Sequence, residues 1–263
     1  MELCFALMNA NTIRGTTREL LLFMEECPGE FKGDCASGIV ITAEKYAPNA
    51  KWHVETLFKV LVTGGNHIRD DTLVASLVQR VSSHPEIQPY AVRALYRAVN
   101  ERSTHQPLAQ AACWCIGEFG QFLLDSDDEG FEGISACAVV DCLEKLLATR
   151  LSNDITRQYS INALAKISTR LSGDIPGRIR EILKNYGTSL DCELQQRSLE
   201  YSRIFDNFDQ MRAGLLETMP PFEKDLEEEE GEAELISAEP ETSAGDLLGL
   251  DGIDFNWKGY LLN

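Results

Sequence analysis

The stretch Pro107-Leu-Ala-Gln-Ala-Ala-Cys-Trp114 begins with proline and continues as a run of small and apolar residues. Proline is favoured in the first turn of a helix, and small side chains let a helix approach its neighbours closely. Four further stretches share this polar or proline start followed by an amphipathic run, and they begin near Asp34, Asp71, Asp154 and Asp191. Successive starts are 37, 36, 47 and 37 residues apart. This spacing predicts a repeated structural unit.

A second apolar segment with helical periodicity lies between successive starts, at residues 54–61, 90–99, 138–151 and 179–186. A pair of helices in each period of this length is typical of HEAT and armadillo solenoids. No two alternating apolar runs are joined by Asn-Gly or Asp-Gly, so the sequence gives no hairpin signal. We therefore expect an all-α helical-repeat solenoid, with an acidic loop insertion at residues 125–130 in the one long interval.

The composition changes at Met219-Pro-Pro221, where two prolines end the last helical pattern. Residues 223–263 contain 13 acidic residues and two lysines, a net charge of −11 out of −18 for the whole chain. Such a segment cannot bury enough apolar surface to offset the entropy of ordering it. The expected organisation is a repeat body over residues 1–222 and a disordered acidic tail over residues 223–263.

Charge and hydropathy exclude several classes of protein. A strongly acidic chain lacks the basic face that binds nucleic acid. No apolar run is long enough for a transmembrane helix. The N-terminus has neither the basic region nor the apolar length of a signal peptide. These observations predict a cytoplasmic protein.

The eight cysteines show no Cys-x-x-Cys pair and no histidine at zinc-finger spacing. In a cytoplasmic protein, scattered cysteines in apolar segments are expected to be reduced and to pack as small hydrophobic residues. This prediction covers Cys4, Cys27, Cys35, Cys113, Cys115, Cys137, Cys142 and Cys192.

Motifs for catalysis, metal or cofactor binding are not found. The loop from Asp125 to Gly130 begins like an EF-hand, but Ala136 stands where the bidentate glutamate is needed. The four histidines, at positions 53, 67, 84 and 105, are too far apart to form a local metal pair. There is no Gly-x-Ser-x-Gly, Walker or Rossmann motif. We expect no enzyme activity, no cofactor and no metal. Three arginines, at positions 93, 97 and 102, are a candidate basic stripe on one helix.

Several longer strings resemble the gamma-type adaptins. They are Asp34-Cys-Ala-Ser-Gly-Ile, Ala43-Glu-Lys-Tyr-Ala-Pro48, Lys51-Trp-His-Val-Glu-Thr56, Ile68-Arg-Asp-Asp71, Gln106-Pro-Leu108, Cys113-Trp-Cys-Ile-Gly-Glu118, Ser168-Thr-Arg170, Tyr186-Gly187 and Glu193-Leu-Gln-Gln-Arg197. The resemblance covers roughly residues 2–222. It suggests the C-terminal half of the adaptin trunk plus the start of the hinge, while the closing residues 256–263 resemble no part of that family.

The resemblance implies a large subunit of adaptor protein complex one, which carries proteins between the Golgi and endosomes in clathrin-coated vesicles. It implies beta-, medium- and small-type adaptor subunits as partners and a peripheral membrane association through the complex. Another HEAT-type scaffold, coatomer-like or karyopherin-like, is the alternative interpretation.

The tail contains Leu247-Leu248-Gly249-Leu250-Asp251, which has the clathrin-box pattern of leucine, apolar, any residue, apolar, acidic. An extended peptide of this kind places alternate apolar side chains in a groove of its partner, and its acidic residue meets basic groups at the rim. Each such site is weak, and clustering on a membrane supplies avidity. Leu247, Leu248, Leu250 and Asp251 are therefore candidate contacts to the clathrin heavy chain.

Overall fold

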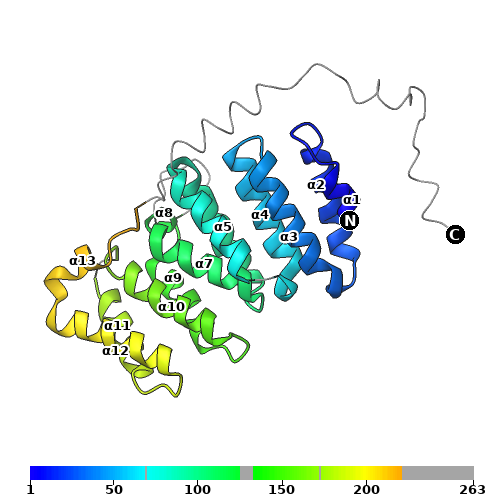
Figure 1. The fold of residues 1–263 in the computed structure, drawn as a ribbon. Helices are drawn as coiled ribbons and strands as arrows, with labels where there is room; N and C mark the ends of the chain where they lie inside the picture. Colours follow the sequence, from blue (N-terminus) through cyan, green and yellow to red (C-terminus); the bar gives the residue numbers. More distant parts are fainter. Residues whose placement is uncertain (69, 125–132, 172, 221–263) are drawn as a thin grey trace, which may run out of the picture. The chain divides into compact units, whose positions relative to one another are not determined.

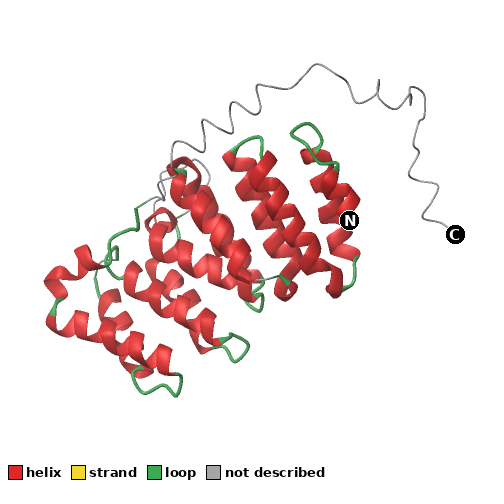
Figure 2. Ribbon diagram, in the orientation of Figure 1, coloured by secondary structure: helices red, strands yellow, loops and turns green. Residues whose placement is uncertain are grey.

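The computed structural model describes residues 1–68, 70–124, 133–171 and 173–220, apart from the side chains of residues 70–72. Every regular element in these residues is a helix (Figures 1 and 2). The α-helices are α1 Glu2–Ala6, α2 Ile13–Glu26, α3 Gly29–Tyr46, α4 Ala50–Gly64, α5 Asp70–Ser83, α6 Gln88–Glu101, α7 Gln106–Phe119, α8 Gln121–Leu124, α9 Ala136–Ala148, α10 Asp154–Ile167, α11 Ile175–Tyr186, α12 Cys192–Asn207 and α13 Arg212–Leu215. Three short 3-10 helices are η1 Gly65–His67, η2 Pro85–Ile87 and η3 Asp209–Met211.

The long helices form successive antiparallel pairs, α2–α3, α4–α5, α6–α7, α9–α10 and α11–α12. The second helix of each pair packs on its partner and on the second helix of the next pair, so α3, α5, α7, α10 and α12 form one layer. Figure 1 shows the pairs following one another in chain order. The all-α repeat prediction is confirmed, and the predicted body boundary at residue 222 lies outside the described residues.

Polar side chains fix several helix starts. Asn153 Oδ1 accepts a hydrogen bond from the Thr156 backbone N–H at 2.7 Å, and Asp191 Oδ1 accepts one from Leu194 N–H at 2.8 Å. These bonds satisfy amide groups that have no partner inside the helix. Asp191 was expected at a start and is the cap of α12, whereas the cap of α10 is Asn153 and not Asp154. At the other end of a helix, Gly65 follows the last residue of α4 and has φ +56°, a conformation that favours glycine.

Two helix boundaries differ from the prediction. Helix α3 begins at Gly29, so Asp34 lies inside it and marks no start. Gly29 and Gly33 lie so close to His67 that a side chain on either would collide with it, and this packing outweighs the low helix propensity of glycine. Helix α9 ends at Ala148 and not at residue 151. There the backbone of Thr149 is extended, with φ −67° and ψ 132°, so the helix does not continue.

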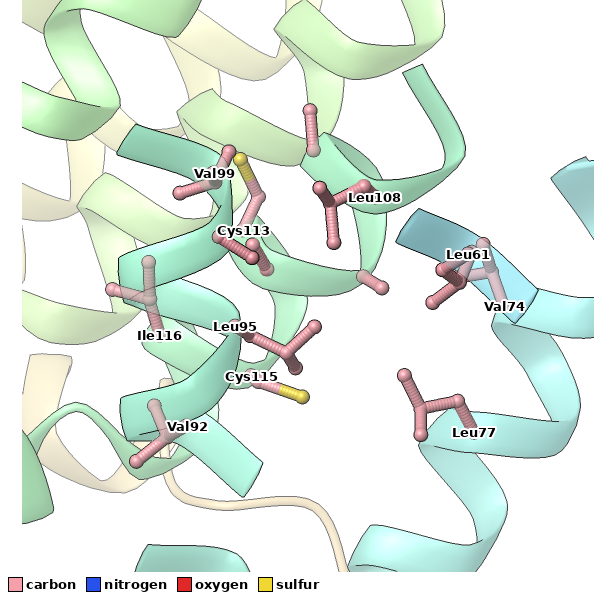
Figure 3. Packing of buried hydrophobic residues seen from close by; sticks show 14 of the residues in the cluster. Leu61, Val74, Leu77, Val92, Leu95, Val99, Leu108, Cys113, Cys115 and Ile116 are labelled. Atoms are coloured by element: carbon pink, nitrogen blue, oxygen red, sulfur yellow. The ribbon is translucent and has the colours of Figure 1, made fainter. Parts of the chain in front are cut away.

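The apolar core runs continuously from the first pair to the last. Helix α6 shows how one helix contributes to this core. Its buried residues repeat at helical spacing and are Ala91, Val92, Leu95, Ala98 and Val99. In Figure 3 the α6 side chains lie beside those of α7, and the thiol of Cys115 is directed towards Leu77 of α5. Each helix pair thus completes the core of its neighbours, which is how a solenoid is stabilised.

Helix α7 is the most enclosed helix, with every residue from Pro107 to Phe119 buried except Trp114. Its contact with α10 is close because small residues face each other. A Cβ atom added to Gly117 would lie 3.0 Å from Ala163 Cα, and Cys113 Sγ lies 3.3 Å from Ser160 Oγ. The small residues on the second helices therefore allow the close approach that the sequence suggested.

Gln106, the first residue of α7, connects turns that lie within successive helix pairs. Its backbone N–H donates to Asn66 Oδ1 at 2.7 Å, and its Oε1 accepts from the Asn153 N–H at 2.9 Å. Its Nε2 donates to the Leu151 carbonyl at 3.0 Å. Through its backbone N–H and its side chain, Gln106 therefore ties the turn after α4 to the turn before α10.

The close α7–α10 contact predicts that Gly117→Val destabilises the body. The added methyl groups must displace the α10 backbone, and overpacking of this kind costs about 1–3 kcal/mol. Urea unfolding followed by circular dichroism measures the free energy of unfolding. Gly177→Val is the matched control, because Gly177 is also helical and has no atom within 4 Å of an added Cβ. Equal midpoints for the two variants would contradict the proposed contact.

Candidate interaction surface

A groove runs across the layer of second helices, with a cavity of about 330 Å³. Its lining comes from three consecutive second helices: Val74, Ala75 and Val78 of α5, Gln110 and Trp114 of α7, and Ile155 and Tyr159 of α10. The two valines, the Gln110–Trp114 pair and the Ile155–Tyr159 pair are each four residues apart. Residues at this spacing share one face of a helix, so each helix presents one pair to the groove.

Trp114 is the one residue between Pro107 and Phe119 of α7 that is not buried, and it lines the groove. Its ring meets Phe119 edge to face, with centroids 5.7 Å apart and planes at 72°. On the α10 side, Ile155 remains 51% exposed. A partly exposed tryptophan beside exposed aliphatic side chains is typical of the anchor positions in protein interfaces.

The groove has few polar groups. Gln110 Nε2 donates to Thr156 Oγ1 at 3.4 Å, so the amide is held against α10. Among the lining residues the Tyr159 phenol is the one titratable group, and no carboxylate, histidine or thiol lines the groove. This lining suits apolar contact with another protein and offers no acid–base pair.

A buried charge cluster lies at the C-terminal ends of α7 and α10. Glu118 is 1% exposed and forms an ion pair with Lys166. Arg170 donates one guanidinium N–H to the Gly117 carbonyl. Burial lowers the pKa of Arg170, while the nearby Glu118 carboxylate raises it. A second oxygen of Glu118, Oε2, accepts from the Met219 N–H at 3.2 Å. The buried carboxylate is thereby satisfied by the Lys166 side chain and by the Met219 backbone N–H.

The cysteines divide into two groups. Cys27, Cys35, Cys113, Cys115 and Cys142 are buried, as predicted. Burial raises the pKa of Cys35 and Cys142 to about 11 and that of Cys113 to about 12, and it also raises the pKa of Cys115. Such thiols stay protonated at neutral pH and are poor nucleophiles.

The prediction is wrong for Cys4, Cys137 and Cys192, which are exposed. Each of the three lies in the first turn or two of its helix, where the helix has just emerged from a loop and its apolar stripe is not yet covered.

The arginines that were predicted to form one basic stripe contact different helices. Arg93 Nε donates to the Phe122 carbonyl of α8 at 3.1 Å, whereas Arg102 Nη1 donates to the Val62 carbonyl of α4 at 2.9 Å. The two guanidinium groups tie α6 to two different helices and do not make a single basic surface.

The remaining sequence features carry no site in the described residues. His53 is buried in the first turn of α4. Over the described ranges, no three histidine, cysteine, aspartate or glutamate side chains gather as metal ligands. The same part of the chain holds no helix long and apolar enough to cross a membrane. The EF-hand-like loop and the clathrin-box residues Leu247, Leu248, Leu250 and Asp251 lie outside the described residues.

The groove joins residues that no local sequence pattern brings together. Its residues come from helices 36 and 45 residues apart in the sequence, counted from Val74 to Gln110 and from Gln110 to Ile155. One sequence signal for the groove was available. Each of three successive second helices carries two groove residues spaced four apart, and at least one of each two is apolar or aromatic. Only the stacking of those helices shows that the pairs share one surface.

Comparison with known proteins identifies the family. Residues 1–209 match the sequence model described as the adaptin N terminal region. The chain belongs to the adaptin family. The human AP-1 complex subunit gamma-like 2 is 45% identical over 235 residues, and the AP-1 complex subunit gamma of Dictyostelium discoideum is 39% identical over 234 residues. These alignments cover 89% and 86% of this chain. A subunit of another complex, AP-2 complex subunit alpha-2 of Dictyostelium discoideum, is 24% identical over 222 residues.

The chain spans 30% of the human relative and 26% of the Dictyostelium gamma relative. The matched adaptin region is described as N-terminal. The expectation that the chain corresponds to the C-terminal half of the trunk is corrected accordingly, and the gamma-type resemblance itself is confirmed. The correction has a physical basis, because successive HEAT-like pairs share one pattern of buried and small residues, and that pattern does not specify where along a solenoid a pair lies.

Proposed function

We propose that this chain serves as the helical scaffold of a clathrin adaptor large subunit of the gamma type. The observation that carries the proposal is the family match over residues 1–209, together with an apolar groove that has the character of a protein interface. The functional role is the binding of other proteins, without a chemical step. The partners are beta-, medium- and small-type adaptor subunits.

The cellular role that follows is vesicle-mediated protein transport between the Golgi and endosomes. The relatives' names place them in AP-1 and AP-2 complexes, which supports an adaptor over a coatomer-like or karyopherin-like carrier. Membrane association would be peripheral and would come through the complex, on cytoplasmic faces of Golgi and endosomal membranes and on coated vesicles.

The groove supplies the proposed contact with a partner adaptor subunit. Its exposed aliphatic Ile155 and half-buried Trp114 offer apolar area flanked by the polar Gln110 amide. A partner helix with an apolar stripe would bury this area, and helix-in-groove binding is a common mode for helical scaffolds. The acidic tail of residues 223–263 supplies the second contact, in which Leu247, Leu248, Leu250 and Asp251 bind the clathrin heavy chain as an extended peptide.

The tail contact predicts the outcome of a pull-down from cytosol. The full chain is expected to recover clathrin heavy chain, and the Leu247→Ala/Leu248→Ala variant is expected to lose most of it because the two apolar anchors are gone. Adaptor subunits bound by the body should remain on both baits, and mass spectrometry identifies the bound proteins. Equal clathrin on the two baits would overturn the role of the motif, and recovery of no adaptor subunit by either bait would overturn the role of the body.

The groove contact predicts a separate effect for Ile155→Asp. Coexpression with beta-, medium- and small-type subunits, followed by affinity capture of the chain, should recover at least about tenfold less of the partner subunits, because a charge replaces buried apolar contact. Leu151→Asp is the matched control, since Leu151 is 66% exposed and lies four residues away, outside the groove. Clathrin recovery should not change with either variant. Equal subunit recovery from both would show that the groove is not the contact.

A further inference from the structure

Within the described residues, which end at 220, α12 is followed by two short helical turns and not by another helix pair. Residues 208–219, called the strap below, run from the end of α12 through η3 and α13 to the ends of α7 and α10 (Figure 1). The chain therefore leaves the described body beside the third and fourth second-layer helices, although the last helix pair is α11–α12.

Three polar contacts hold the strap. The Met219 N–H donates to Glu118 Oε2 at 3.2 Å, across 101 residues of sequence. Arg170 Nη2 donates to the Thr218 hydroxyl at 2.8 Å, and Arg212 Nη1 donates to the Ser168 hydroxyl at 3.4 Å. The contacts of Met219 and Thr218 both reach the buried charge cluster, and they form a latch at the end of the strap.

Apolar contacts add little to the strap. Neither η3 nor α13 contains a buried residue, and Leu216 is the one strap side chain classed as buried. Arg212 also lies over the Phe205 ring at 4.4 Å and pairs with Asp209 at 3.2 Å, but both partners are local. Segments with few buried apolar contacts open at a small fraction of the free energy needed for global unfolding.

The latch can also open without leaving a buried charge unpaired. Glu118 keeps its ion pair with Lys166 when Met219 departs, and Arg170 keeps the Gly117 carbonyl when Thr218 departs. A buried carboxylate without a partner would make opening costly, and that penalty does not arise here. The helices beneath the strap thus have their own polar partners.

We propose that residues 208–219 are a detachable strap, latched at Glu118 and Arg170, that opens and closes while the helix pairs stay folded. The chain beyond it then leaves the body at Met219 in the closed state and at Asn207 in the open state. Opening of the strap therefore adds residues 208–219 to the length of chain that links the body to the acidic tail. This inference concerns the folded chain alone and does not depend on the adaptor function.

Hydrogen–deuterium exchange of the full chain, read by mass spectrometry on peptides covering residues 208–219, tests the strap. The latch variant is Thr218→Ala/Met219→Pro, which removes the hydroxyl acceptor and the amide donor without touching the core. The matched control is Glu217→Ala, since Glu217 is exposed and lies in the same segment. The latch variant is expected to speed exchange of strap amides at least about tenfold, the effect of losing a hydrogen bond to a charged group.

Peptides from α7, α10 and α12 should exchange at the wild-type rate in both variants. Two results would overturn the proposal. If the strap exchanges equally fast in wild type, control and latch variant, the contacts with Glu118 and Arg170 hold nothing. If the latch variant also speeds exchange in α7 or α10, the strap is part of the folded body and is not detachable.

Discussion

The contact between α7 and α10 is the constraint on which the body depends. Gly117 leaves room for the Ala163 backbone, and the Cys113 thiol meets the Ser160 hydroxyl, so two helices from successive pairs approach with almost no side chain between them. The 47-residue interval, the longest between successive starts, falls between these two helices. A loop insertion in that interval is compatible with the fold because the helices, and not the loop, carry the packing.

This contact also positions both candidate sites. Trp114, the one residue between Pro107 and Phe119 of α7 that is not buried, lines the groove together with residues of α5 and α10. At the other end of the same two helices, Glu118 and Lys166 are brought together, and this pair receives the returning chain at Met219. A shift of α10 along α7 would alter the groove and the latch together.

Much of the fold follows from the sequence, because helix pairs are local and repeat. The period of about 37 residues reflects a repeated local unit, and the cap at Asp191 rests on interactions within a few residues. The start predicted at Asp34 was wrong because α3 already begins at Gly29, and the close packing of Gly29 and Gly33 on His67 joins residues remote in sequence. The groove and the latch could not be predicted for the same reason, since they join residues up to 101 positions apart. The resemblance to gamma-type adaptins came from strings along residues 34–197, and the comparisons confirm it, whereas the position within the trunk needed correction.

Native-state hydrogen exchange along the whole body tests the central claim most directly, because it ranks the helices by the free energy needed to open them. If the α7–α10 contact is the foundation of the fold, the amides of α7 and α10 exchange slowest, and those of α2 and α12 exchange earlier. Exchange of α7 at the rate of α2 or α12 would contradict this account.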